Sequence, residues 1–159
     1  MDSIRSFDID SQRSIEQLSS ISVYPATEVI LTEDELRRGM ELITREKDEY
    51  EAKLRKAFNT EEAHRIDTII RQLKEEVLEF RNTTNTDGYI SYFYKETASF
   101  LELFDRKTTA VFIDEPMRTY EHAQAVETEF RENMTHRLEK GYILPGQLNL
   151  LYVTEKIIA

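Results

Sequence analysis

Cysteine is absent from this chain of 159 residues. The sequence therefore offers no thiol for a disulfide framework, a thiolate metal site or a cysteine nucleophile. Only four glycines and three prolines are present, which argues against a fold made of many short strands and tight turns. No apolar run approaches the roughly 20 residues of a membrane-spanning helix, and the N-terminus lacks the pattern of a secretory signal. We therefore expect a cytoplasmic protein without a membrane partner.

Basic residues are outnumbered by acidic ones. The chain has 31 acidic and 21 basic residues, which gives a net charge of −10. That balance opposes autonomous non-specific binding to DNA or RNA, because such binding depends on neutralising phosphates. It does not exclude nucleic-acid work within a larger protein that supplies a basic surface elsewhere. Hydrophobic residues make up 40% of the chain, enough for one soluble domain with a core.

Common catalytic motifs are missing as well. The chain contains no H-E-x-x-H zinc motif and no G-x-S-x-G nucleophile motif. Its histidines are scattered along charged helical stretches, at His64, His122 and His136. We therefore predict no catalytic residue and no metal site among them.

The glycine-rich loop that binds nucleotide phosphates is absent too. Such a loop follows the pattern G-x-x-x-x-G-K-[ST]. Gly141 and Gly146 have the required separation, but Gln147 and Leu148 stand where lysine and a hydroxyl residue are needed. Pro145 also removes one amide that would face a phosphate. The isolated chain is therefore predicted not to be an ATPase and to hold no cofactor.

What the chain does contain, first, is two long helical patterns. Thr32 and Glu35 form a capping box that opens one helix, and apolar residues follow at nearly heptad spacing, interrupted only by Lys47. Asn59 and Glu62 form a similar pattern that opens a second helix with the same apolar period. The two patterns predict an antiparallel helical hairpin.

We place this hairpin at about residues 32–82 and expect it to project from a body as a solvated arm. Arg81–Gly88 is rich in turn-forming residues, and the aromatic stretch from Tyr89 to Phe104 is expected to lie in a core or interface. Before the hairpin, residues 2–10 indicate a short strand or an extended lead-in. One or two further short strands are expected between Ser20 and Leu31.

The second half of the chain suggests a parallel sheet. Ala110–Ile113 and Asn149–Val153 are unalternated apolar runs, which are typical of strands covered on both faces. Between them, Thr119–Lys140 has helical periodicity and ends at Gly141, a favourable left-handed C-cap. A strand, a helix and a second strand in this order predict a β-α-β crossover, and hence an α/β fold.

Two adjacent acids follow the first of these predicted strands. Asp114 and Glu115 stand where a nucleotide-hydrolysing enzyme presents a carboxylate to Mg²⁺. Since the phosphate loop is missing, we interpret this pair as a vestigial acidic motif that binds neither cofactor nor metal.

Several segments together resemble one family. RSFDIDSQRSIEQLSSISVYPATEVIL (Arg5–Leu31) resembles the junction in bacterial transcription-repair coupling factors (Mfd) where the second domain returns to the first. YFYKETASFLELF (Tyr92–Phe104) and TAVFIDEP (Thr109–Pro116) are similar to later parts of the same N-terminal module. That module is related to UvrB of nucleotide excision repair. The resemblance covers about residues 3–155.

The resemblance implies a partial parallel sheet of a P-loop-NTPase-like, degenerate helicase domain with a helical hairpin insertion. Residues 1–18 would be the last strand and linker of the preceding UvrA-binding-type domain. Residues 19–159 would be the second half of the UvrB-like first domain. The chain would then be an excised piece whose initiating methionine is not native.

The function that this resemblance implies is that of a non-catalytic scaffold. The parent would be an ATP-dependent DNA translocase, with Mg²⁺ and ATP bound outside this chain, that displaces stalled RNA polymerase and recruits UvrA. Contacts with UvrA, RNA polymerase and DNA would be made through the parent, and this segment would pack on the rest of the parent chain.

Two alternatives stay open. One is the matching part of the UvrB helicase subunit, although UvrB-type sequences continue the acidic motif with Ser-His, where this chain has Pro116 and Met117. The other is a stand-alone acidic helical adaptor.

Overall fold

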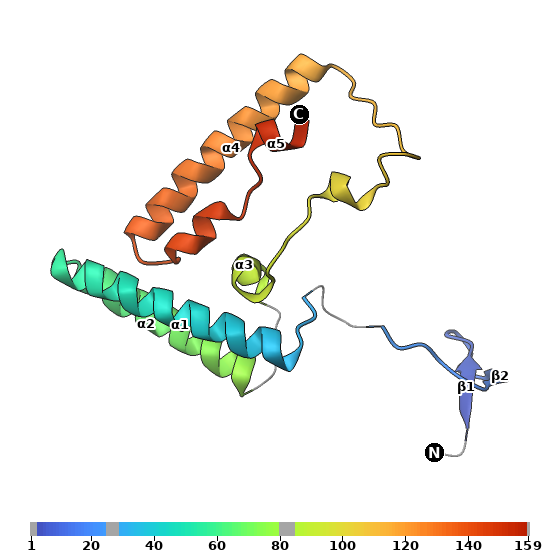
Figure 1. Cartoon of the computed structure of the whole chain (residues 1–159). Helices are drawn as coiled ribbons and strands as arrows, with labels where there is room; N and C mark the ends of the chain where they lie inside the picture. The colour runs from blue at the N-terminus through green and yellow to red at the C-terminus, as the bar shows by residue number, and fades with distance from the viewer. Residues whose placement is uncertain (1–2, 25–28, 80–84, 159) are drawn as a thin grey trace.

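Helices make up most of the chain, whose computed structural model describes residues 3–24, 29–79 and 85–158 (Figure 1). In chain order the elements are β1 Ile4–Phe7, β2 Ser14–Leu18, α1 Glu33–Lys56, α2 Thr60–Leu78, the 3₁₀ turn η1 Asp87–Tyr89, α3 Ile90–Phe93, η2 Phe100–Leu103, α4 Pro116–Glu139, η3 Pro145–Asn149 and α5 Thr154–Ile158. The α/β class is thus confirmed at its coarsest level, as helices with one two-stranded antiparallel sheet.

The predicted helical hairpin is confirmed as α1 and α2, which lie side by side in Figure 1. The capping box at the start of α1 is present in full. The Thr32 backbone N–H donates to Glu35 Oε2 at 2.9 Å, and the Glu35 N–H donates to Thr32 Oγ1 at 3.3 Å. The predicted end of the hairpin, near residue 82, lies outside the described residues.

The second predicted capping box is wrong. Asn59 is the N-cap of α2, but its side chain makes no capping hydrogen bond. Its backbone N–H donates instead to Leu54 O at 2.9 Å, closing the turn that ends α1. Because Phe58 adopts a left-handed conformation with φ of 63° in this turn, the backbone of Asn59 is set by the tight connection rather than by a cap.

The hairpin is part of the core and not a projecting solvated arm. Phe93 of α3 is fully buried against α1. A Cβ on Gly39 would lie only 2.1 Å from Phe93 Cδ1, so the absence of a side chain at Gly39 is what lets the ring seat. The apolar stripes of α1 and α2 and the residues around α3 form one buried cluster: Leu36, Met40, Ile43, Leu54, Ala63, Ile66, Ile70, Leu73, Val77, Tyr89, Tyr92, Phe93 and Leu144.

The third long helix is confirmed as α4, although it starts three residues before the predicted Thr119. Pro116 occupies its first turn, where proline's fixed φ suits a helix and its missing N–H costs nothing. At the other end Gly141 has φ of 68°, as predicted for a left-handed cap. Its N–H donates to Leu138 O at 2.8 Å and the Tyr142 N–H donates to Arg137 O at 2.9 Å, a complete Schellman motif.

The two predicted parallel strands do not form in the described residues. Ala110–Ile113 is irregular and exposed, and Asn149–Val153 begins in η3 and continues without strand pairing. No β-α-β crossover is therefore present in residues 85–158. A strand needs a neighbour for its backbone N–H and C=O groups, and an apolar run by itself supplies none.

At the N-terminus β1 and β2 form an antiparallel hairpin with Ile4 opposite Leu18. The extended segment predicted in residues 2–10 thus becomes β1, and a second strand forms at β2. The further strands expected around Val23 and Val29–Leu31 are absent from the described residues, and Pro25 lies outside them. Figure 1 shows this small sheet set apart from the helices.

The turn and the aromatic stretch also divide. Residues 81–84 of the predicted turn lie outside the described residues, and the remainder leads into η1. Tyr89, Tyr92 and Phe93 are buried as expected, whereas Phe100 and Phe104 are exposed and contact each other edge to face, with ring centroids 5.2 Å apart.

Candidate functional site

The predicted acidic motif lies at the exposed start of α4. Glu115 is the N-cap residue, with a left-handed φ of 48°, and its side chain makes no capping hydrogen bond. Its carboxylate pairs instead with Arg118, Oε2 to Nη1, at 3.0 Å. The Thr119 backbone N–H donates to Glu115 O at 3.0 Å, and its hydroxyl donates to Asp114 O at 3.2 Å.

The two acids thus shape the first turn of α4 chiefly through their backbone carbonyls. Their side chains are exposed and face solvent or a neighbouring arginine. Within residues 3–24, 29–79 and 85–158, no three or more His, Cys, Asp or Glu side chains gather closely enough to hold a metal ion.

Gly141–Leu148, the stretch with the glycine spacing of a phosphate loop but without its lysine, turns the chain from α4 into η3. It lies against the α1–α2 hairpin. A Cβ on Gly141 would lie 2.4 Å from the Glu62 backbone oxygen. A Cβ on Gly146 would lie 2.4 Å from Tyr92 Oη. The two glycines therefore permit close backbone contact with the hairpin and α3.

Side chains of the hairpin bind the carbonyls at the C-terminus of α4. The Tyr50 hydroxyl of α1 donates to Leu138 O at 2.7 Å, and Arg65 of α2 donates to Lys140 O. The Arg65 guanidinium also lies over the Tyr142 ring, 4.8 Å from its centroid. The negative pole of the helix dipole stabilises a cation at this end of α4, so the hairpin adds two hydrogen bonds to those of the Schellman motif.

Glu46 of α1 binds two distant parts of the chain. Its carboxylate accepts a hydrogen bond from the Tyr92 hydroxyl of α3. It also accepts one from the Gly146 N–H, at 3.0 Å. The two carboxylate oxygens each take one donor, so one half-buried side chain links residues that are 46 and 100 positions away in sequence. Burial, and then the hydrogen bond to Glu46, raises the pKa of Tyr92, so this phenol stays a donor throughout the ordinary pH range.

Gln147 completes the contact from the loop side and is itself buried. Its Oε1 accepts from the Leu144 N–H at 2.8 Å, and its Nε2 donates to Gly88 O at 2.9 Å. We call the set formed by Glu46, Tyr50, Arg65 and Tyr92 with residues 138–147 the hairpin–loop junction. It can hold the hairpin, α3 and α4 in a fixed arrangement.

A separate groove runs along α1 on another side of the hairpin, with a volume of about 760 Å³. Charged side chains such as Arg37, Glu41 and Arg45 line it together with Lys74 and Leu78 at the end of α2.

None of the described helices is both long and apolar enough to cross a membrane.

Sequence reasoning missed the hairpin–loop junction. Tyr50 was visible only as a member of an apolar stripe, and Glu46 as one of many acids on a charged helix. The one local signal was the glycine pair Gly141 and Gly146 around a proline, a pattern that indicates close backbone approach without naming the partner.

The chain is similar to known proteins, although no family model matches it. It is 35% identical over its entire length to the transcription-repair-coupling factor of Bacillus subtilis, and covers 13% of that protein. Over 92% of its length it is 30% identical to UvrABC system protein B of Thermotoga petrophila, covering 23% of it. The transcription-repair-coupling factor of Staphylococcus epidermidis is 23% identical over the same share of the chain.

These similarities confirm the resemblance to coupling factors and to UvrB. The chain spans less than a quarter of the length of each of these relatives.

Proposed function

We propose that this chain is a non-catalytic scaffold segment from the UvrB-like module of a transcription-repair-coupling factor. The observation that carries the proposal is the 35% identity to such a factor over all 159 residues. In that setting the segment serves transcription-coupled nucleotide excision repair in the cytoplasm. ATP-driven movement on DNA, displacement of RNA polymerase and recruitment of UvrA are tasks of the longer protein, with ATP and Mg²⁺ bound outside residues 1–159.

The absence of catalysis is supported by how the candidate residues are used. Asp114 and Glu115 start α4 with exposed side chains, one of them paired with Arg118. The glycine pair of the loop is occupied by close contacts with Glu62 and Tyr92. The Gly141 and Gly146 amides already donate to Leu138 O and to the Glu46 carboxylate, so the glycine pair offers no free amides to surround a triphosphate, which a nucleotide site requires.

The scaffold role itself is supported by the hairpin–loop junction. Helices α1, α2, α3 and α4 meet there through hydrogen bonds between residues far apart in sequence. Such an arrangement keeps a helical insertion at a set position on the module, so that surfaces on either side of it are held relative to each other.

We further propose that Ala110–Ile113 becomes a strand of a parallel, P-loop-NTPase-like sheet when the rest of the longer protein is present. Val111, Phe112 and Ile113 are exposed by 57%, 91% and 45%, which is unfavourable for three large apolar side chains in succession. The domain division at residues 18 and 19 belongs to the same proposal, with β1 and β2 on the side of the preceding domain.

Nucleotide binding tests the scaffold role directly. Calorimetric titration of the chain with ATP and Mg²⁺ is expected to give no micromolar binding. Micromolar affinity that is lost on Asp114→Ala, but kept on Glu121→Ala as an exposed acid further along α4, would overturn the proposal.

The matching part of UvrB is the second candidate, because the chain is 30% identical to UvrABC system protein B over 92% of its length. The pair Pro116–Met117 after the acidic motif favours the coupling factor, since the resemblance to UvrB implies Ser-His at that place. The coding sequence upstream of this segment distinguishes them: a G-x-x-x-x-G-K-[ST] motif there would favour UvrB.

A further inference from the structure

Lys47 interrupts the apolar stripe by which α1 packs on α2. The stripe on either side of it is buried, with Met40 and Ile43 before it and Leu54 after it. A lysine in such a row is expected to reach solvent, because its charge is costly to bury. The Lys47 side chain nevertheless remains only 13% exposed.

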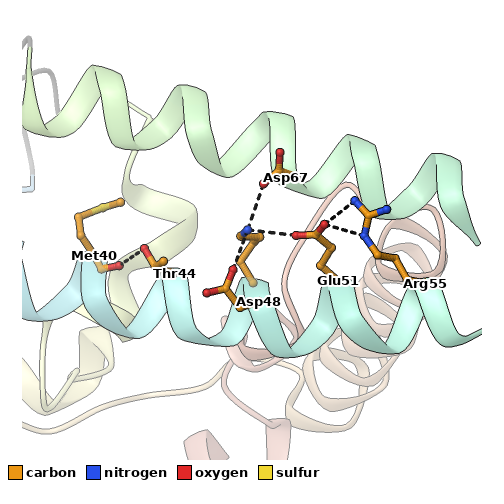
Figure 2. Close-up of polar contacts among 7 residues, drawn as sticks. Met40, Thr44, Asp48, Glu51, Arg55 and Asp67 are labelled. Carbon is orange, nitrogen blue, oxygen red and sulfur yellow. Dashed lines mark hydrogen bonds and ion pairs between the residues drawn. The ribbon is translucent and has the colours of Figure 1, made fainter.

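Three carboxylates, those of Asp48, Glu51 and Asp67, lie around its ammonium group. Figure 2 labels all three, with dashed lines for their ion pairs. Lys47 Nζ lies 2.8 Å from Asp48 Oδ1 and 3.1 Å from Glu51 Oε2, both on α1. It also lies 3.0 Å from Asp67 Oδ1, which comes from α2. Of these three contacts, the one with Asp67 joins the two helices.

The charges in this cluster are firmly held. Burial opposes the charge of Lys47, but hydrogen bonds to Asp48, Asp67 and Glu51 outweigh it and raise the pKa of the lysine. The hydrogen bond from Lys47 in turn lowers the pKa of Asp67. Glu51 is bound on its other side by Arg55, at 2.6 Å from Nη2 to Oε1. Lysine and aspartate therefore stay ionised and paired near neutral pH.

Apolar stripes by themselves leave the register of two helices weakly specified. Aliphatic side chains spaced by three and four residues pack nearly as well after a shift of one or two turns, whereas a polar residue within the stripe has one satisfactory partner. A shift of one turn moves a helix by about 5.4 Å, which would separate Lys47 from Asp67 and leave a shielded ammonium without its partner on α2.

Register matters here because both helices contact the same loop. Glu46 and Tyr50 of α1 bind Gly146 and Leu138, while Arg65 of α2 binds Lys140. These contacts can form together only if α1 and α2 are aligned. Lys47 follows Glu46 directly, and Asp67 is two residues from Arg65, so the ion pair lies at the same level of the hairpin as the junction.

We propose that Lys47, through Asp67, sets the register of α1 against α2 and so aligns the hairpin–loop junction. Lys47 is a positioning residue, since its ion pairs with Asp48, Glu51 and Asp67 lie within the hairpin and it acts through the helix pair. This assignment rests on the geometry of the hairpin and is independent of the function proposed above.

The test is Lys47→Met in the full 159-residue chain, because methionine keeps the length and the apolar stem of lysine without its charge. Helix content by circular dichroism is expected to stay unchanged. Protection of the Gly146 amide against hydrogen exchange is expected to fall by about tenfold or more, and NMR signals of residues 138–147 are expected to double or broaden.

Arg55→Met is the matched control. Arg55 belongs to the same cluster and binds Glu51, but it makes no ion pair with α2. Protection of the Gly146 amide is therefore expected to stay unchanged in this variant. Lys47→Arg is expected to restore protection, because it restores a cation that reaches Asp67. If Lys47→Met does not fold, Asp67→Asn removes the same link at a more exposed position and must give the same loss at Gly146.

Unchanged protection and single signals in a folded Lys47→Met or Asp67→Asn chain would overturn the proposal. Equal losses in Arg55→Met would also overturn it, because they would trace the effect to the charge of the cluster as a whole rather than to the link between the helices.

Discussion

Gly141 is the residue whose replacement the structure penalises most clearly. Its φ of 68° is strained for any residue with a Cβ, and that Cβ would lie 2.4 Å from a backbone oxygen, that of Glu62. Backbone atoms cannot rotate away as a side chain can. We expect Gly141→Ala to destabilise the chain by about 2–4 kcal/mol, measured as a lower midpoint of urea unfolding.

Lys140→Ala provides the control at the preceding position. Lys140 has an ordinary φ of −86°, and it is its backbone carbonyl that accepts from Arg65. The lysine side chain is exposed, so its loss is expected to cost about 0.5 kcal/mol or less. Equal losses at the two positions would contradict the role given to Gly141.

At the scale of elements, two helix starts with similar sequence patterns are expected to respond differently. Thr32→Ala removes a capping box that is present in full and should cost about 1 kcal/mol. Asn59→Ala removes a side chain that makes no capping bond and should cost clearly less. Thermal unfolding of both variants checks this, and a larger loss at Asn59 would contradict it.

The contact between α4 and α5 is expected to depend on pH. Glu127 of α4 accepts from the Thr154 N–H at 2.9 Å and from its hydroxyl at 3.0 Å. These bonds, with the hydrogen bond from Arg131, lower the pKa of Glu127 below its ordinary value of 4.5. Because the folded-state pKa is the lower one, the stabilisation is complete above about pH 4.5 and is lost as pH falls through the folded-state value.

The Thr154 amide signal in NMR spectra should therefore shift as the solution is acidified below pH 4.5. Glu127→Gln removes the titrating group, so the Thr154 amide signal should no longer shift with pH in this range. A titration of Thr154 that survives in Glu127→Gln would contradict the assignment.

How much of each element was visible in the sequence depended on how local its cause is. Helix α1 was predicted with its cap, because Thr32 and Glu35 are three residues apart. Helix α4 was predicted with its left-handed glycine. Only its start was misplaced, since the helix begins at Pro116 and not at Thr119. The cap at Asn59 failed because the turn from α1 already determined the backbone there.

At the scale of the whole molecule, the segment 110–113 distinguishes the isolated chain from the longer protein. No backbone hydrogen bond is donated from Ala110–Ile113 to another described residue. The amides of this segment are expected to exchange with solvent rapidly, while those of Ile66 and Ile70 in the buried face of α2 exchange slowly.

Hydrogen exchange followed by mass spectrometry checks this in both settings. In the longer protein the same segment is expected to become protected, because a sheet would then supply its backbone partners. Rapid exchange in both would contradict the proposed strand.

The sequence by itself determined the long helices, the two caps at Thr32 and Gly141, and the similarity to coupling factors. Each of these rests on residues within a few positions of one another or on the letters themselves. The tertiary structure alone decided that Glu46, Tyr50 and Arg65 meet residues 138–147, and that the apolar run at Ala110–Ile113 has no strand beside it. A hydrogen bond across 100 residues, or a missing sheet neighbour, depends on what the fold brings alongside, which no local pattern encodes.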